Sequence, residues 1–157
     1  NVSFLGLGLG REMASIEFAR NVMGLTDADT TEVAPATPYP VIDLMPDQNL
    51  QNLGHTMRLG AYRCVLKEGT KARAAYGTSE VWERHRHRYE FTNAFLEAFE
   101  KAGMVVSGRN PERNLVEIIE LPDHPFFVAT QFHPEFKSRP DRPHPLFLAF
   151  LTAALAQ

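Results

Sequence analysis

The first 24 residues change from a continuous apolar run to an apolar spacing of three and four. Residues 2 to 7, VSFLGL, have the pattern of a short buried strand. Residues 11 to 23 have the spacing of an amphipathic helix, with apolar side chains at Met13, Ile16, Ala19, Val22 and Met23. Gly24 stands where a C-cap glycine is expected. A strand, a tight glycine turn and a helix together indicate an α/β fold.

The middle of the chain has weaker periodicity. Residues 26 to 54 are rich in Pro, Asp, Asn and Thr, and they are predicted to be mostly loop. Residues 56 to 76 predict short strands interrupted by Gly60 and Gly69. Residues 91 to 102 predict a helix, which the next glycine ends.

The last third of the chain has clear element boundaries. Residues 104 to 108 and 114 to 121 predict two strands joined by a turn at RNPER. The turn PDHP leads into a further strand over residues 126 to 132. A proline-rich loop then precedes a final helix over residues 146 to 155. The whole pattern predicts one α/β domain that contains an antiparallel hairpin.

Composition narrows the class of protein. The 157 residues suit one domain, and a net charge of -3 gives no general attraction to nucleic acid. No apolar run reaches the roughly 18 residues that cross a bilayer, and the N-terminus lacks the basic region of a signal peptide. Cys64 is the only cysteine, which suits a reducing compartment, so a cytoplasmic location is expected. The chain begins with Asn1 rather than Met, which suggests a segment of a longer protein.

Three interpretations compete for the turn FLGLGLGREM, residues 4 to 13. A dinucleotide-binding turn needs Gly-x-Gly-x-x-Gly, but the third glycine would fall on Arg11. A P-loop fails because no Gly-Lys-Ser/Thr follows. A nucleophile elbow fits the flanking Gly6 and Gly10, but its nucleophile position is Gly8, which has no side chain. Taken alone, the stretch favours a plain strand-to-helix turn.

The segment TQFHPEF carries a candidate acid–base pair. His133 ends a predicted strand and Glu135 follows two residues later, with Pro134 constraining the backbone between them. A base and an orienting carboxylate so close together fit the nucleophile–base–orienter arrangement. A lone pair of this kind is more often a surface feature, so the segment alone is a weak signal. No second pair of His or Cys stands at metal-ligand spacing, so no metal site is expected.

The run ERHRHRYE, residues 83 to 90, holds the densest charge in the chain. As a strand it places Arg84, Arg86 and Arg88 on one side and the histidines on the other. An anion-binding site and a solvated or salt-bridged strand both fit this pattern. A nucleic-acid patch fits less well, because glutamates bracket the run and the chain is net acidic.

The segments also occur in a characteristic order. After the elbow come DLMPDQ, GHTMRLG, ERHRHRYEF, LVEIIELPDHPFFVATQFHPEFKSRP and HPLF. In this order they resemble the C-terminal glutaminase domain of the CTP synthase family, within the class I glutamine amidotransferases. The resemblance covers about Phe4 to Ala154, and RHRHRYE with QFHPEFKSRP is its most specific part. It implies a flavodoxin-like mixed α/β sheet flanked by helices. Residues 1–157 would be the C-terminal portion of that domain, without its N-terminal part and without the synthetase domain.

The resemblance implies a specific activity. In the family an elbow cysteine attacks the side-chain amide of L-glutamine, forms a thioester and releases ammonia. A synthetase domain then uses the ammonia, with ATP and Mg²⁺, to convert UTP to CTP. The implied partners are therefore L-glutamine and the synthetase domain, in a homo-oligomer that is a tetramer in the full-length family. No cofactor, metal, nucleic-acid or membrane partner is implied for this segment itself.

Four residues match the family's site. His133 matches the catalytic base and Glu135 the residue that orients it. Arg88 matches the arginine that holds the glutamine α-carboxylate, and Glu32 matches the carboxylate that binds the α-amino group. The resemblance therefore implies a recognition shell in addition to the acid–base pair.

The elbow itself departs from the family. The family reads Gly-x-Cys-Leu-Gly-Met-Gln, whereas here Gly8 replaces the nucleophilic cysteine, Arg11 an apolar residue and Glu12 the glutamine-contacting Gln. Leu9 and Gly10 still match the turn whose N–H groups help to form the oxyanion hole and the glutamine site. We therefore expect hydrolysis to be disabled in this chain.

A further departure is His55, which stands where the family has glycine. The departures leave two hypotheses open. The chain is either a glutaminase segment that retains glutamine recognition through Arg88 and Glu32, or a non-catalytic scaffold or regulatory module that binds no glutamine. A direct glutamine-binding measurement separates the two.

Overall fold

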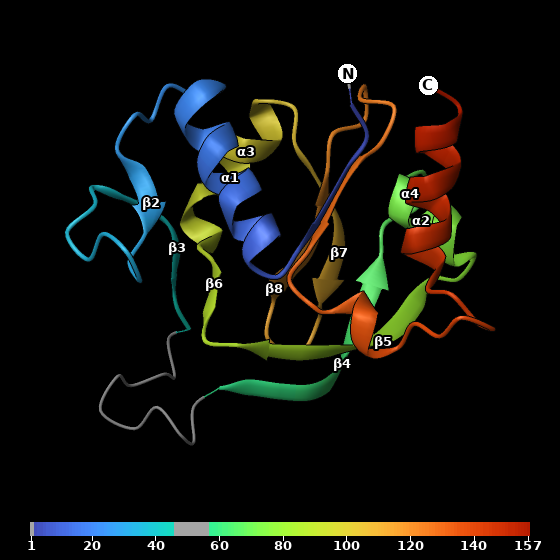
Figure 1. Ribbon diagram of the computed structural model, residues 1–157. Coiled ribbons are helices and arrows are strands. Elements are labelled where there is room, and N and C mark those ends of the chain that lie inside the picture. Colours follow the sequence, from blue (N-terminus) through green and yellow to red (C-terminus); the bar gives the residue numbers. More distant parts are fainter. Residues whose placement is uncertain (1, 46–56) are drawn as a thin grey trace.

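The computed structural model describes residues 2–45 and 57–157 (Figure 1). His55 and parts of the DLMPDQ and GHTMRLG segments lie outside these residues. The helices and strands are, in chain order, β1 (Phe4–Leu7), α1 (Leu9–Asn21), β2 (Ala28–Thr30), β3 (Tyr39–Leu44), β4 (Arg58–Leu66), α2 (Lys71–Tyr76), β5 (Glu80–His87), β6 (Tyr89–Phe91), the 3₁₀ helix η2 (Asn93–Phe95), α3 (Leu96–Lys101), β7 (Val105–Asn110), β8 (Leu115–Glu120), β9 (Phe127–Thr130), the 3₁₀ helix η3 (Pro134–Phe136) and α4 (Pro145–Leu155).

The strands form two sheets. The larger sheet has the order β1-β9-β8-β7-β4-β5, in which β1 and β9 are parallel and the other neighbours are antiparallel. The smaller sheet has the order β2-β3-β6, with one parallel and one antiparallel pair. The predicted mixed α/β fold is therefore confirmed.

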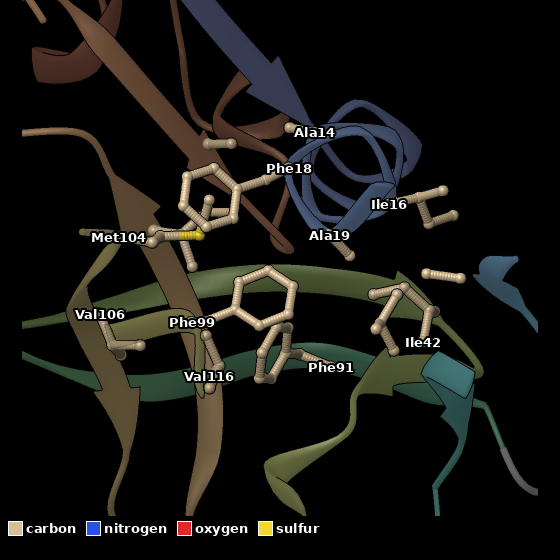
Figure 2. Close-up of a cluster of buried hydrophobic side chains, with 14 residues drawn as sticks. Ala14, Ile16, Phe18, Ala19, Ile42, Phe91, Phe99, Met104, Val106 and Val116 are labelled. Carbon is tan, nitrogen blue, oxygen red and sulfur yellow. The ribbon is translucent and has the colours of Figure 1, made fainter. Parts of the chain in front are cut away.

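Helices cover both faces of the larger sheet. α1 and α3 lie on one face, and α2 and α4 lie on the other (Figure 1). Under α1, the ring of Phe99 from α3 stacks on Phe18 at 5.5 Å and meets Phe91 of β6 edge-on at 4.9 Å (Figure 2). A second cluster, which includes Phe132 and Leu146, lies under α2 and α4. Each face thus has its own core, and the sheet between them holds the ends of β1 and β9 in place.

The structure corrects the predictions for the middle of the chain in detail. Residues 26 to 54 were predicted to be rich in loop, and the described part also contains the short strands β2 and β3, in which β3 pairs with β2 on one side and β6 on the other. Gly60 does not interrupt a strand: β4 runs through it with φ +93° and stays paired with β5. Residues 71 to 76 form the helix α2, whose N-cap Thr70 accepts a hydrogen bond from the Arg73 backbone N–H.

Two helix predictions are right in place and wrong in detail. The helix predicted over residues 11 to 23 exists as α1, but Met13 and Val22 are exposed, and its buried face includes Arg11 and Glu12. The helix predicted over 91 to 102 begins later, because Phe91 belongs to β6. No helix in the described part of the chain is long and apolar enough to cross a membrane.

Candidate functional site

The turn between β1 and α1 has the shape of a nucleophile elbow. Gly8 has φ +53° and ψ −112°, in the region that side-chain-bearing residues rarely adopt. Its backbone N–H donates to the Thr130 carbonyl at 2.8 Å, which ties the turn to β9. Leu9 and Gly10 begin α1, where backbone N–H groups have no acceptor within the helix. The elbow geometry is therefore present at a position without a nucleophile.

His133 lies directly over Gly8. A Cβ atom built on Gly8 would lie 2.8 Å from His133 Cε1 and 3.1 Å from Nε2. On its other side, His133 Nδ1 is 2.6 Å from Glu135 Oε1, and the imidazole stacks on Phe136 at 5.0 Å. The ring thus presents Nε2 to position 8 while the carboxylate of Glu135 holds Nδ1.

A pocket of about 330 Å³ opens between the elbow and the arginine–histidine run. Its lining residues are Gly8, Leu9, Glu12, Glu32, Met57, Arg86, His87, Arg88, Tyr89, Gln131 and His133. The pocket therefore brings together most of the residues that the sequence pointed to, from five separate segments of the chain. It holds arginine, carboxylate and imidazole side chains within a space that fits a small zwitterion.

Two of the predicted glutamine-binding residues, Gly10 and Arg11, do not line the pocket. Arg11 is fully buried. Its guanidinium instead donates to the side-chain carbonyl of Gln131, whose amide donates to Glu12 Oε1 at 3.0 Å. Burial lowers the pKa of Arg11 and raises the pKa of the Glu12 carboxyl. Arg11 therefore supports the pocket wall from behind and does not face a ligand.

A buried ionic network lies beneath this wall. Arg58 donates to Glu90 Oε1 at 3.0 Å and to Glu117, and Arg11 Nη2 lies 3.7 Å from the second oxygen of Glu90. Burial raises the pKa of Glu90 to about 7 even though two guanidinium groups oppose this shift. Glu117 reaches the network because β8 bulges there, with Val116 paired to Arg109 and the residue after Glu117 paired to Gly108.

Two buried histidines complete the network. His85 Nδ1 lies 2.8 Å from His87 Nε2, and His87 Nδ1 lies 3.0 Å from the Tyr89 carbonyl, to which it can donate. Burial, reinforced by the positive charge of Arg58, lowers the pKa of both histidines well below the ordinary value. Both rings are therefore neutral at physiological pH, and only His87 reaches the pocket.

Sequence reasoning missed several residues of the site. Strict alternation was expected along residues 83 to 90, but it holds only to about Arg86, because β5 ends at His87 and β6 begins at Tyr89. Consecutive residues on both sides of this break therefore line the pocket. Gln131 was also missed. It follows the end of β9 and stands two residues before His133, and this spacing was the available signal.

Comparison with known protein families identifies the family of the chain. Residues 1–153 match the family described as Glutamine amidotransferase class-I. The chain therefore belongs to the class I glutamine amidotransferase family. It is 63% identical over 153 residues to the CTP synthase of Thermomicrobium roseum and 55% identical over 156 residues to that of Staphylococcus aureus. Within the family it is a glutaminase domain of the CTP synthase type.

Solved structures agree with this assignment. The glutaminase domain of Trypanosoma brucei CTPS, with bound acivicin, has a TM-score of 0.92 and 37% identity, and the match covers 99% of this chain and 61% of that one. A protein of the GMP synthase type from Thermoplasma acidophilum shares only the fold, with a TM-score of 0.60 at 14% identity. The chain spans 28% of the length of the Thermomicrobium relative and 29% of the Staphylococcus one.

Proposed function

We propose that this chain is the glutamine-binding C-terminal portion of a CTP synthase glutaminase domain, in which Gly8 has removed hydrolysis and left recognition. In an intact family member the domain hydrolyses L-glutamine and supplies ammonia for the amination of UTP to CTP. The observation that carries the proposal is the pocket in which Arg88, Glu32 and His133 surround the empty nucleophile position.

The charges of the pocket suit an α-amino acid. Arg88 offers a guanidinium fork that matches the geometry of an α-carboxylate. Glu32 offers a carboxylate to the α-ammonium group. The negative charge of Glu32 also adds to the effect of burial in raising the pKa of the Glu12 carboxyl. An ammonium ion between the two carboxylates would relieve this repulsion, and the glutamine side chain would then extend toward Gly8 and His133.

The same geometry leaves no route to a thioester. His133 Nε2 lies 3.1 Å from where a Cβ of residue 8 would be, but Gly8 has no hydroxyl or thiol that could give up a proton to it. The N–H groups of Leu9 and Gly10 would still polarise a bound amide. Loss of a triad nucleophile costs on the order of 10⁶ in kcat in a well-studied protease. We therefore expect binding without detectable turnover.

The partners follow from the same proposal. We infer that the chain acts beside a CTP synthase synthetase domain, which would hold the ATP and Mg²⁺, within a homotetramer. A cytoplasmic location, suggested by the single cysteine, fits that pathway. No role in binding nucleic acid or membrane is proposed.

Isothermal titration calorimetry with L-glutamine tests the proposal. We expect weak but measurable binding to the unmodified chain and its loss in Arg88→Ala. Arg84→Ala is the matched control, because Arg84 belongs to the same run, is exposed and does not line the pocket. If the unmodified chain binds no glutamine at millimolar concentration, the scaffold hypothesis replaces this proposal.

A further inference from the structure

A second cluster of polar side chains lies outside the pocket, around the buried carboxylate of Glu83 in β5. Glu83 Oε1 accepts hydrogen bonds from the Tyr76 hydroxyl at 2.9 Å and from His144 Nε2 at 3.0 Å, and it lies 3.3 Å from Lys137 Nζ. These partners come from α2, from the cap of α4 and from the segment that follows His133. One carboxylate therefore joins three parts of the chain.

The hydrogen bonds and charges around Glu83 fix which atoms of its partners carry a proton. The Leu146 backbone N–H donates to His144 Nδ1, so the neutral ring carries its proton on Nε2 and donates it to Glu83. Burial and the charge of Glu83 raise the pKa of Tyr76, which keeps its hydroxyl a donor. Lys137 supplies the positive charge that a buried carboxylate requires.

The cluster holds the segment that carries the candidate acid–base pair. The His133 backbone N–H donates to the Arg84 carbonyl at 2.9 Å, and Lys137 Nζ donates to the Trp82 carbonyl at 2.6 Å. The His144 backbone N–H donates to Ser138 Oγ at 3.1 Å. Residues 133–144 are thus attached to β5 at their beginning, middle and end, and Glu83 makes two of the side-chain attachments.

The pair of His133 and Glu135 needs such support. Their side chains are 23% and 44% exposed, and an ion pair or hydrogen bond this open to water contributes little to its own geometry. The 2.6 Å contact between Nδ1 and Oε1 therefore depends on a backbone that already places the two side chains together.

We propose that Glu83 is a positioning residue, whose carboxylate fixes residues 133–144 against β5 and so aims the His133 imidazole at position 8. Glu83 itself lies outside the pocket lining. The proposal concerns the same site as the proposed function and rests on it for its biological meaning, but its test does not require glutamine to bind.

Nitrogen-15 NMR of the histidine side chains tests the proposal. The spectra are recorded on the unmodified chain at a pH at which the His133 imidazole is neutral. His133 should show the tautomer protonated on Nδ1, with a downfield proton in the bond to Glu135. In Glu83→Ala this proton signal should disappear and the ring should change to the other tautomer. Glu83→Gln, which keeps an acceptor for Tyr76 and His144, should preserve part of the signal.

Two controls separate positioning from a general loss of stability. Glu80→Gln changes a glutamate of the same strand that pairs with Arg63, and it should leave the His133 signals unchanged. Ile42→Ala weakens the other core and should also leave them unchanged. If Glu83→Ala does not fold, Lys137→Met provides the test, because it removes the contacts of Lys137 with Glu83 and with the Trp82 carbonyl but leaves the contact of His144 with Glu83. A folded Glu83→Ala or Lys137→Met with the Nδ1 proton intact overturns the proposal, whether or not glutamine binds.

Discussion

The two walls of the pocket around position 8 differ in how they fit the site that the family resemblance implies. On the elbow side, Gly8, Arg11 and Glu12 stand where the resemblance leads us to expect other residues. On the histidine side, His133 and Glu135 are the residues that it leads us to expect, and we propose that the Glu83 cluster positions them. Both walls nevertheless keep an ordered geometry, with the elbow hydrogen-bonded to Thr130 and the histidine segment bonded to β5.

The contrast separates shape from chemistry. Glycine adopts the positive φ of the elbow without strain, so the backbone of an elbow can form at a position that has no nucleophilic side chain. Arg11 is accommodated because Glu90 and Gln131 lie within reach of its guanidinium. Arg11 and Glu12 thus belong to one buried hydrogen-bonded arrangement through Gln131, whereas His133 and Glu135 lie beside a position that has no nucleophilic side chain.

Returning a thiol to the elbow gives the largest expected effect. Gly8→Cys should react with a chloroketone analogue of glutamine on the order of 10³-fold faster than the unmodified chain, because the thiol would lie beside His133. The gain stays below that of an intact site, since the new Cβ would lie 2.8 Å from Cε1 and the imidazole must shift. Mass spectrometry of the labelled peptide measures the rate and the position.

Gly8→Ala is the matched control, because it introduces the same Cβ and the same backbone strain, on the order of 1–3 kcal/mol, without a thiol. Cys64 supplies an internal control. It is buried, and burial raises the pKa of its thiol, so it should stay unlabelled. Labelling of Cys64 with none at position 8 would show that the two walls do not form one site.

Removing the charge beneath the elbow side should give the next largest effect. Arg58→Met leaves Glu90 and Glu117 buried without their main partner, which should lower the free energy of unfolding by about 3–5 kcal/mol. Urea-induced unfolding measures the loss. Arg63→Met is the control, since its pairs with Glu80 and Glu112 are solvent-exposed, and its loss should be far smaller. Equal losses would mean that the network does not support this wall.

The elbow and the acid–base pair could both be predicted from the sequence. The strand, turn and helix around Gly8 follow from apolar spacing and glycine placement, which depend only on neighbouring residues. His133 and Glu135 could be recognised because two residues separate them. Strands β2 and β3 were missed because β2 has three residues and β3 contains Pro40, so neither shows the alternation that marks a strand.

The supporting network could not be predicted from the sequence. Arg58, Glu90 and Glu117 lie in three different strands, and charged residues in strands usually face solvent. Their meeting depends on the bulge in β8 and on the pairing of β4 with β5, which are properties of the whole sheet. Glu83 likewise looked like one end of a charged run until His144, 61 residues later, was seen to contact it.

The smallest predicted effect concerns the pH dependence of the elbow-side network. The pKa of His87 is lowered in the folded protein by burial and by Arg58 and Arg11, so this imidazole takes up a proton only on unfolding. Below about pH 6.5 the unfolded chain therefore binds the extra proton, and the free energy of unfolding falls as the pH falls, by about 1.4 kcal/mol per pH unit.

His87→Gln removes this proton while its amide can still donate to the Tyr89 carbonyl and bond to His85 Nδ1. Between pH 7.5 and 5.5 the free energy of unfolding, measured by urea titration, should therefore fall less steeply in His87→Gln than in the unmodified chain. The two should differ in their change by about 1.4 kcal/mol. If the free energy of unfolding of His87→Gln falls as steeply as that of the unmodified chain, His87 takes up its proton in the folded state, and the neutral network beneath the elbow is wrong.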